Sequence, residues 1–256
     1  MDASHLIPPE PQKDWAYFLD FDGTLVDIAD RPEGVRVERE LVSLLVDLDR
    51  TTGAAVVLVS GRTIPDLDSH LKPLKLRAAG LHGLEYRVGR DGPIERHGPS
   101  PATLDPVRPS LASFAACHEG IQIEDKGVSL AVHFRRAPEC EAEARRAAES
   151  ACCDLGPAFA CLPGKMVYEI KPRVAHKGQV IEKFMNITTF SGRRPVFIGD
   201  DITDEDGFRA CNARGGISVR VGASDQPTEA NFRLRNVEEV EDWLGQMIET
   251  AKGLTP

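Results

Sequence analysis

Two aspartates separated by a single residue directly follow an apolar run near the start of the chain. The run from Trp15 to Leu19 is typical of a buried strand, and Asp20, Asp22 and Gly23 come next. Because residues two apart in a strand point to the same side, we expect the two carboxylates to converge at the strand's carboxyl end. Carboxylates held together repel each other unless a cation or a shared proton compensates them. The pair therefore predicts a metal site, a proton-transfer site or both.

A second acidic cluster follows another apolar run late in the sequence. Pro195–Gly199 predicts a buried strand, and the acidic residues beyond it are Asp200, Asp201, Asp204, Glu205 and Asp206. Helix capping accounts for one or two such side chains but not for all of them. Oxygen ligands without thiols favour Mg²⁺, a hard cation that keeps several of its waters. We therefore expect Mg²⁺ to bind at this strand end.

Two further segments carry groups suited to a phosphoryl anion. Ser60–Arg62 ends the apolar run Ala54–Ser60 and offers a hydroxyl, a backbone N–H and a guanidinium. Alone this signal is weak, because a serine at a strand end is more often a turn residue. Lys177 stands at the start of a helix predicted to run on through 179–187, where free N–H groups and the helix dipole favour an anion. A lysine at this end of a helix indicates a nearby negative group.

The elements that must position these groups alternate between strand and helix patterns. The strand-like runs are Ala16–Asp20, Ala54–Ser60, parts of Arg77–Val88, Pro195–Gly199 and Gly216–Val221. The helical patterns are Glu38–Arg50 and Val237–Lys252. Such alternation predicts an α/β class, with a doubly wound, Rossmann-like parallel sheet.

The middle of the chain departs from this alternation. Its proline-rich stretch Gly98–Pro109 predicts a linker. Beyond it we expect two hairpins flanking a helix, over Ile121–Asp125 with Val128–Arg135, Pro138–Cys153, and Phe159–Leu162 with Met166–Ile170. The sequence therefore predicts a core domain of residues 1–100 and 173–256 interrupted by a small α+β cap domain of residues 101–172. Residues 1–13 are polar and proline-rich, and we expect a loose leader there.

Composition narrows the classes of partner and compartment. The 256 residues carry a formal net charge of −9, which argues against a nucleic-acid partner. No apolar run approaches the ~18 residues that a membrane span needs. No export signal is apparent, so we expect a cytoplasmic monomer acting on a small molecule. The six cysteines match no zinc-binding spacing and are expected to be ordinary small apolar residues.

The phosphate-binding and acidic segments, in this order and with an insertion between the second and third, resemble the trehalose-6-phosphate phosphatases of the haloacid dehalogenase superfamily. The motifs that carry the resemblance are Asp-Phe-Asp-Gly-Thr-Leu at 20–25, Ser-Gly-Arg at 60–62, Gly-Leu-His-Gly-Leu-Glu at 80–85 and Gly-Asp-Asp-Ile-Thr-Asp-Glu at 199–205. The last motif separates this family from most of its relatives. In the cap, residues 124–126, 133–135, 165 and 168–172 resemble the family's sugar-binding positions.

The resemblance implies a Mg²⁺-dependent phosphatase that converts trehalose 6-phosphate to trehalose and phosphate through an aspartyl-phosphate. It implies catalytic roles for Asp20 as nucleophile, Asp22 as general acid and base, and Ser60 and Lys177 as phosphoryl-binding groups. The implied metal ligands are Asp20, Asp22 through its backbone carbonyl, Asp200, Asp201 and Asp204. The implied substrate-binding residues are Thr24, Arg62, Glu124, Lys126, Arg135, Lys165 and Glu169.

Three alternatives remain open from the sequence. The nearest keeps the chemistry and changes the sugar, for example to a sucrose or mannosylglycerate phosphate. A phosphomutase built on the same core would return the phosphoryl group to sugar instead of water. A sugar-phosphate sensor without catalysis is disfavoured, because a sensor has no need of a nucleophile such as Asp20. His82 is expected to be structural.

Overall fold

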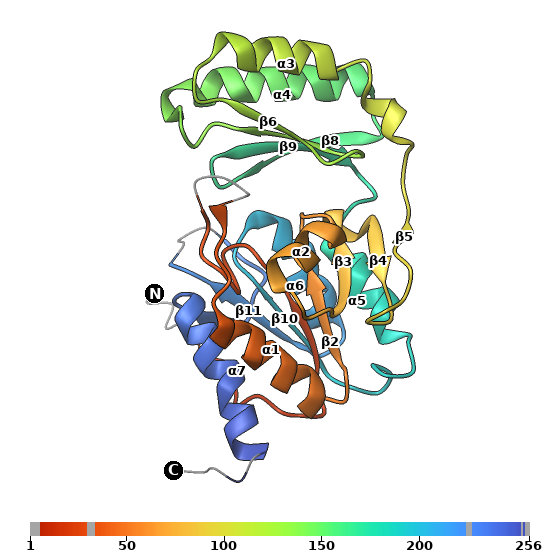
Figure 1. The fold of residues 1–256 in the computed structure, drawn as a ribbon, viewed down its shortest axis with the longest axis vertical. Helices are drawn as coiled ribbons and strands as arrows, with labels where there is room; N and C mark the ends of the chain where they lie inside the picture. The colour runs from red at the N-terminus through yellow and green to blue at the C-terminus, as the bar shows by residue number, and fades with distance from the viewer. Residues whose placement is uncertain (1–5, 30–33, 224–226, 252, 254–256) are drawn as a thin grey trace. The chain divides into compact units, whose positions relative to one another are not determined.

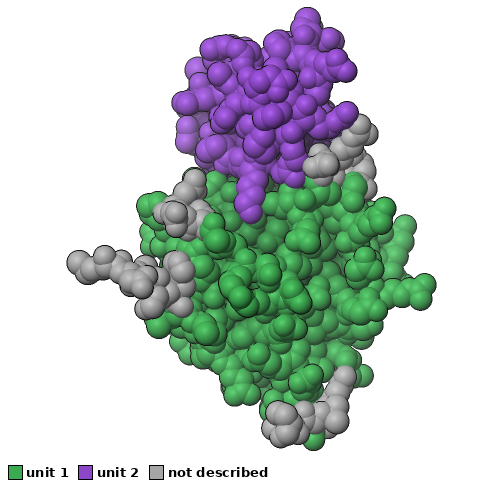
Figure 2. Space-filling model, turned by 90° about the vertical axis from the view of Figure 1, so that its left-hand side faces the viewer, with its two compact units in different colours: residues 1–95, 176–256 green, residues 96–175 purple. Residues whose placement is uncertain are grey.

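The computed structural model of the chain describes residues 6–29, 34–223, 227–251 and 253. The chain forms two compact units, one made of residues 1–95 and 176–256 and the other of residues 96–175 (Figure 2). The first unit therefore consists of two stretches of chain that the second unit separates in the sequence.

An eight-stranded sheet forms the centre of the first unit (Figure 1). Its order in space is β12-β11-β10-β1-β2-β3-β4-β5; neighbouring strands from β12 to β3 are parallel, and β4 is antiparallel to β3. The strands are β1 (Ala16–Leu19), β2 (Val56–Val59), β3 (Arg77–Gly80), β4 (Glu85–Arg87), β5 (Glu95–Arg96), β10 (Pro195–Gly199), β11 (Ile217–Val221) and β12 (Phe232–Leu234).

Helices cover both faces of this sheet. Because successive strand residues point to opposite faces, Tyr17 and Leu19 of β1 pack with α1, α2 and α7, whereas Ala16 and Phe18 pack with α5 and α6. Burial on both faces explains the continuous apolar runs and confirms the predicted α/β class. The helices are α1 (Arg39–Thr51), α2 (Ile64–Leu71), α5 (Lys177–Met185), α6 (Glu205–Ala213) and α7 (Val237–Ala251), with short 3₁₀ helices η2 (Leu81–Gly83) and η5 (Ile202–Asp204).

The central strand β1 marks a switch in the winding of the sheet. The chain leaves β1 toward β2 on one side, whereas it leaves the neighbouring strand β10 toward β11 on the other side, so these two connections run in opposite directions. In open α/β sheets, ligands bind outside the carboxyl ends of the strands at such a point. The two sequence motifs with paired aspartates follow β1 and β10, directly at this position.

The second unit is a four-stranded sheet of order β6-β7-β9-β8 with two helices packed on one face (Figure 1). Leu130 and Val132 of β7 belong to the apolar core under the helices, so Ala131 and His133 lie on the opposite face. The strands are β6 (Gln122–Asp125), β7 (Leu130–His133), β8 (Phe159–Gly164) and β9 (Val167–Pro172). The helices are α3 (Arg108–Cys117) and α4 (Glu141–Leu155), with 3₁₀ helices η3 (Pro101–Leu104) and η4 (Pro138–Cys140). Both predicted hairpins are confirmed.

Two sequence expectations need correction. The proline-rich stretch 98–109 is not simply a linker, because η3 and the start of α3 lie within it and Leu104 and Val107 are buried. The leader is not loose where the structure describes it, from residue 6 onward. The Pro9 carbonyl accepts a hydrogen bond from Trp243 Nε1 at 3.0 Å, and the Leu6 carbonyl accepts one from the Arg233 N–H at 3.1 Å. Residues 1–5 of the expected leader lie outside the described residues.

Every helix in the described ranges is too short or too polar to cross a lipid bilayer.

Candidate active site

Asp20 lies just past the carboxyl end of β1 and is buried against a lysine. The Nζ of Lys177, the first residue of α5, lies 2.7 Å from Asp20 Oδ1 and 2.6 Å from Asp204 Oδ1. All three side chains are buried. A positive charge at a helix start is unfavourable on its own, and two carboxylates compensate it here. They raise the pKa of Lys177, although burial alone would lower it.

Three buried carboxylates converge at this point. One oxygen from each of Asp20, Asp200 and Asp204 lies within 4.8 Å of the others. Burial, followed by repulsion from Asp204 and Asp200, raises the pKa of Asp20 well above its usual value even though Lys177 opposes the shift. Three carboxylates and one ammonium leave the cluster negatively charged in its ionised form. These oxygen donors fit a hard divalent cation, which would keep Asp20 ionised.

The acidic residues after β10 have different local partners. Asp204 Oδ2 accepts the backbone N–H groups of Asp200 and Asp201 at 3.0 Å each, while Asp201 Oδ1 accepts the Ile202 N–H at 2.7 Å. The side chains of Asp201 and Asp204 also each accept the backbone N–H of the other, which is a capping box at the start of η5. Glu205 Oε1 accepts a hydrogen bond from Nη1 of Arg220, in β11, at 2.6 Å. The structure thus brings Asp200 and Asp204 to Asp20 but does not bring the Asp201 side chain into that triad.

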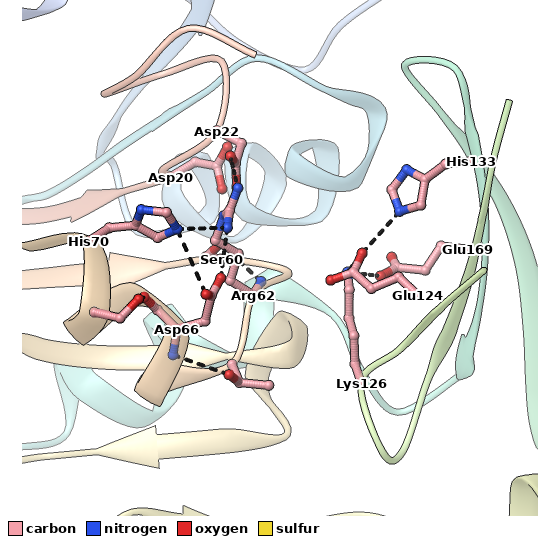
Figure 3. Close-up of polar contacts among 12 residues, drawn as sticks. Asp20, Asp22, Ser60, Arg62, Asp66, His70, Glu124, Lys126, His133 and Glu169 are labelled. Atoms are coloured by element: carbon pink, nitrogen blue, oxygen red, sulfur yellow. Dashed lines mark hydrogen bonds and ion pairs between the residues drawn. The ribbon is translucent and has the colours of Figure 1, made fainter. Parts of the chain in front are cut away.

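Asp22 turns to an arginine from the next loop. Arg62 donates from Nε to Asp22 Oδ2 at 2.7 Å and from Nη2 to Oδ1 at 2.8 Å (Figure 3). Its Nη1 donates to Asp66 at 2.7 Å and lies 3.2 Å from His70 Nε2. From the sequence, Arg62 is expected near the substrate, and its contacts with Asp22, Asp66 and His70 are not predicted. The four-residue spacing of Arg62, Asp66 and His70 was the available signal for the α2 contacts.

The loop that contains Ser60 forms backbone hydrogen bonds with η2, the segment after β3. Ser60 is buried, and its Oγ accepts the Arg62 N–H at 3.1 Å. The Ser60 carbonyl accepts the His82 N–H, and the Arg62 carbonyl accepts the Leu81 N–H, both at 2.9 Å. Leu81 and His82 have φ angles of 51° and 53°, a left-handed backbone that non-glycine residues rarely adopt. This backbone pairing fixes the loop that carries the predicted phosphoryl-binding hydroxyl.

The turn after Asp22 packs tightly against the second aspartate motif. Gly23 has a φ of 83°, and a Cβ at this position would lie 2.2 Å from Asp200 Oδ2. Only glycine lets the two loops approach this closely. The neighbouring Thr24 is fully buried, and its hydroxyl has no hydrogen-bond partner among the residues that the structure describes.

A separate polar cluster lies within the second unit. Lys126 Nζ lies 3.0 Å from Glu169 Oε1 and 3.8 Å from Glu124 Oε2, and His133 Nε2 lies 2.9 Å from Glu124 Oε2 (Figure 3). Glu124 and Glu169 both pair in register with Ala131, so they share the sheet face opposite the helices. Burial favours a higher pKa for Glu124, but the His133 hydrogen bond and the nearby positive charges outweigh it and lower the pKa.

The two remaining residues predicted to contact sugar meet at the β8–β9 turn, which contains Lys165. Arg135 follows β7, and its Nη2 donates to the Lys165 carbonyl at 2.9 Å. Lys165 is exposed in the turn itself. The structure therefore joins Arg135 to Lys165 through a backbone contact, and gathers the other three predicted cap residues into the cluster around Lys126.

Comparisons with known proteins agree on one family. The sequence profile of the trehalose-phosphatase family matches residues 18–238. The chain is 40% identical over 216 residues to a probable trehalose-phosphate phosphatase of Sinorhizobium fredii, covering 84% of this chain and 81% of the relative. It is 38% identical over 243 residues to the trehalose-6-phosphate phosphatase of Escherichia coli, covering 95% and 90%. The C-terminal domain of the Candida albicans trehalose-6-phosphate phosphatase shares the fold, with a TM-score of 0.81, 20% identity and coverage of 97% and 100%.

Proposed function

Because the chain belongs to the trehalose-phosphatase family, we propose that it hydrolyses trehalose 6-phosphate to trehalose and inorganic phosphate. The observation that carries this proposal is the setting of Asp20. This carboxylate is buried at the end of the central strand, 2.7 Å from Lys177 and close to two further buried carboxylates. Such a setting suits a nucleophile that must approach a phosphoryl group with its charge compensated.

The reaction proceeds in two displacements at phosphorus. An Asp20 carboxylate oxygen attacks phosphorus, the bond from phosphorus to the sugar oxygen breaks, and Asp22 gives its proton to that oxygen. This step releases trehalose and leaves an aspartyl-phosphate. Water then attacks phosphorus, Asp22 takes the water's proton, and the bond to Asp20 breaks. Phosphate leaves, and both aspartates return to their starting states.

The residues around Asp20 would stabilise the transferred group. Lys177 and Ser60 hold phosphoryl oxygens, because an ammonium and a hydroxyl are donors that match them. Mg²⁺ would be held by Asp20, Asp200 and Asp204, with the Asp22 carbonyl and Asp201 as further oxygen donors. When bound, it supplies charge neutralisation for the phosphoryl oxygens. The crowding of the Asp20, Asp200 and Asp204 carboxylates supports this assignment.

The second unit is assigned the role of a sugar-binding cap. Glu124, Lys126 and Glu169 present carboxylates and an ammonium on one sheet face, and these groups suit the hydroxyls of a disaccharide. Arg135 and Lys165 are assigned to the same role on sequence resemblance. Thr24 and Arg62 are the substrate-binding candidates of the first unit. We also assign a monomeric state and a cytoplasmic location, as expected from the sequence.

The proposal is tested by measuring phosphate release from a panel of phosphate esters. The panel contains trehalose 6-phosphate, sucrose 6-phosphate, mannosylglycerate phosphate and 4-nitrophenyl phosphate, each with Mg²⁺ and with a chelator. We expect the highest kcat/KM for trehalose 6-phosphate, and no turnover with chelator. Transfer of phosphate to sugar without its release would identify a mutase instead.

The cap assignment has its own test in the same assay. Glu169→Gln is expected to lower kcat/KM for trehalose 6-phosphate far more than for 4-nitrophenyl phosphate, because the small ester has no sugar hydroxyls to bind. Equal losses on the two substrates would contradict the assignment.

A further inference from the structure

Arg62 Nη1, the guanidinium nitrogen that does not contact Asp22, contacts two side chains of α2. Nη1 donates to Asp66 Oδ2 at 2.7 Å and lies 3.2 Å from His70 Nε2 (Figure 3). A guanidinium carries five N–H donors in one rigid plane. The contacts to Asp22, Asp66 and His70 engage four of the five. Because contacts at Nη1 fix the guanidinium plane from one side, the orientation of Nε and Nη2 toward Asp22 is fixed as well.

We propose that Asp66 and His70 are positioning residues for proton transfer in the phosphatase reaction. They hold the plane of Arg62, and Arg62 in turn holds the carboxylate of Asp22 in the direction of the departing sugar oxygen. The inference rests on the proposed function, in which Asp22 moves the proton. Asp66 and His70 act through Arg62 and are not assigned any contact with the substrate.

The geometry of α2 suits this role. Asp66 and His70 are four residues apart, so their side chains share one face of the helix. The Thr63 hydroxyl caps the first turn by accepting the Asp66 N–H at 3.3 Å. Phe21 closes the arrangement from the β1 loop, since its ring centroid lies 6.1 Å from that of His70 and 5.7 Å from Arg62 Cζ. The residue between the two catalytic aspartates therefore packs on the same assembly.

The chemistry of the contact defines the informative substitutions. A guanidinium can only donate, so a hydrogen bond at this contact requires His70 Nε2 to accept. Glutamine at position 70 can present an oxygen acceptor in its place, whereas leucine fills the site without one. The Asp66 side chain is 42% exposed, so Asp66→Ala removes its carboxylate without leaving a buried cavity.

The test compares two substrates that differ in their need for a proton. The alkoxide of trehalose is a poor leaving group, whereas 4-nitrophenolate departs readily without protonation. The ratio kcat/KM covers all steps through departure of the leaving group. For Asp66→Ala and His70→Leu we expect a loss of roughly 10- to 100-fold with trehalose 6-phosphate, as for a misplaced proton donor, and less than about threefold with 4-nitrophenyl phosphate. His70→Gln should retain most of the wild-type kcat/KM for trehalose 6-phosphate that His70→Leu loses.

Asp68→Ala is the matched control. Asp68 lies on the same helix and pairs with the buried Arg87, with Arg87 Nη2 at 2.7 Å from Oδ1. Its loss should lower the melting temperature without separating the two substrates. Equal losses on both substrates in Asp66→Ala, or the same separation in Asp68→Ala, would overturn the proposal. If His70→Leu fails to fold, Asp66→Ala gives the same readout at an exposed position. Absence of phosphate release by the wild-type protein on every substrate would instead overturn the proposed function.

Discussion

Arg62 and Asp22 face each other edge to edge, with Nε at 2.7 Å from Oδ2 and Nη2 at 2.8 Å from Oδ1. Two parallel charge-assisted hydrogen bonds fix the carboxylate in one plane, which a single bond does not. The Arg62 side chain is only 8% exposed, whereas that of Asp22 is 34% exposed. The carboxylate is therefore held from the protein side and stays accessible on the other, as a group that exchanges a proton with a ligand must be.

Arg62→Lys is expected to reduce activity although it keeps the positive charge. A lysine ammonium is a point charge and cannot form both parallel bonds to Asp22. We expect kcat for trehalose 6-phosphate to fall by about one to two orders of magnitude. The assay is phosphate release with Mg²⁺ at saturating substrate.

Arg87→Lys is the control for this change. Arg87 forms a comparable fork with Asp68 and is equally buried, but its partner is not Asp22. The control should lose stability and retain kcat. If both variants lost kcat to the same degree, the loss would come from destabilisation of α2. Such a result would contradict the role of the two Arg62–Asp22 hydrogen bonds in catalysis.

Lys177→Met should destabilise the ion-free protein strongly. The substitution leaves the buried carboxylates of Asp20 and Asp204 facing each other without their ammonium. Removing one partner of a buried ion pair costs about 3–5 kcal/mol. Chemical denaturation should show a loss of this size, and added Mg²⁺ should recover part of it. Lys183→Met, at a partly exposed position of the same helix, should cost far less; comparable losses would argue against the pairing.

Gly23→Ala tests the close approach of the two aspartate loops. The new Cβ would lie 2.2 Å from Asp200 Oδ2, so the loops must separate and the carboxylate triad must open. We expect a large loss of turnover and a higher Mg²⁺ concentration at half-maximal activity.

Gly192→Ala separates backbone strain from this steric effect. Gly192 has a similar φ of 77°, but nothing lies within 4 Å of its added Cβ. The control should cost about 1–2 kcal/mol of stability and leave the Mg²⁺ dependence unchanged. A Mg²⁺ dependence of Gly23→Ala equal to that of wild type would show that Asp200 does not need this close packing.

The sequence predicted best those elements whose signal is local. β10 has the bounds expected from its continuous apolar run, Pro195–Gly199, and the winding of α and β elements followed from the same runs. The sequence also placed Asp20, Asp200 and Asp204 after strand ends, where parallel topology brings them together. It did not predict α2, because the helix has only eight residues and a proline in its first turn. The contacts of Asp66 and His70 with Arg62 were missed for that reason.

In the second unit, local sequence patterns predict the hairpins but not how the two hairpins pair with each other. Strand-like runs separated by the turn residues Lys126-Gly127 and Pro163-Gly164 predicted both hairpins. The pairing of β7 with β9, however, joins strands that are separated by α4 and β8. No local pattern specifies which edges of two hairpins will meet. That pairing places Glu169 beside Ala131 and so brings it within reach of Lys126 and Glu124. The sequence could name these residues from family resemblance, but not the ion pairs among them.

Glu124 is expected to make the stability of the second unit sensitive to acid. Burial alone would raise its pKa, but the hydrogen bond from His133 and the charges of Lys126 and His133 lower it overall. A carboxyl whose pKa is lower in the folded state stabilises the fold above its unfolded pKa of about 4.3, and this contribution is lost as the pH falls through the folded value.

The Glu124→Gln variant lacks this titration, so its comparison with wild type isolates the effect. The difference in unfolding free energy between the two proteins should shrink progressively below about pH 4.3 as the wild-type carboxylate takes up its proton. Denaturant titrations at a series of pH values measure it. Glu119→Gln, at an exposed position of the same unit, should show a much smaller change with pH. A difference for Glu124→Gln that stayed constant down to pH values where the protein unfolds would mean that His133 and Lys126 do not hold Glu124 as a carboxylate.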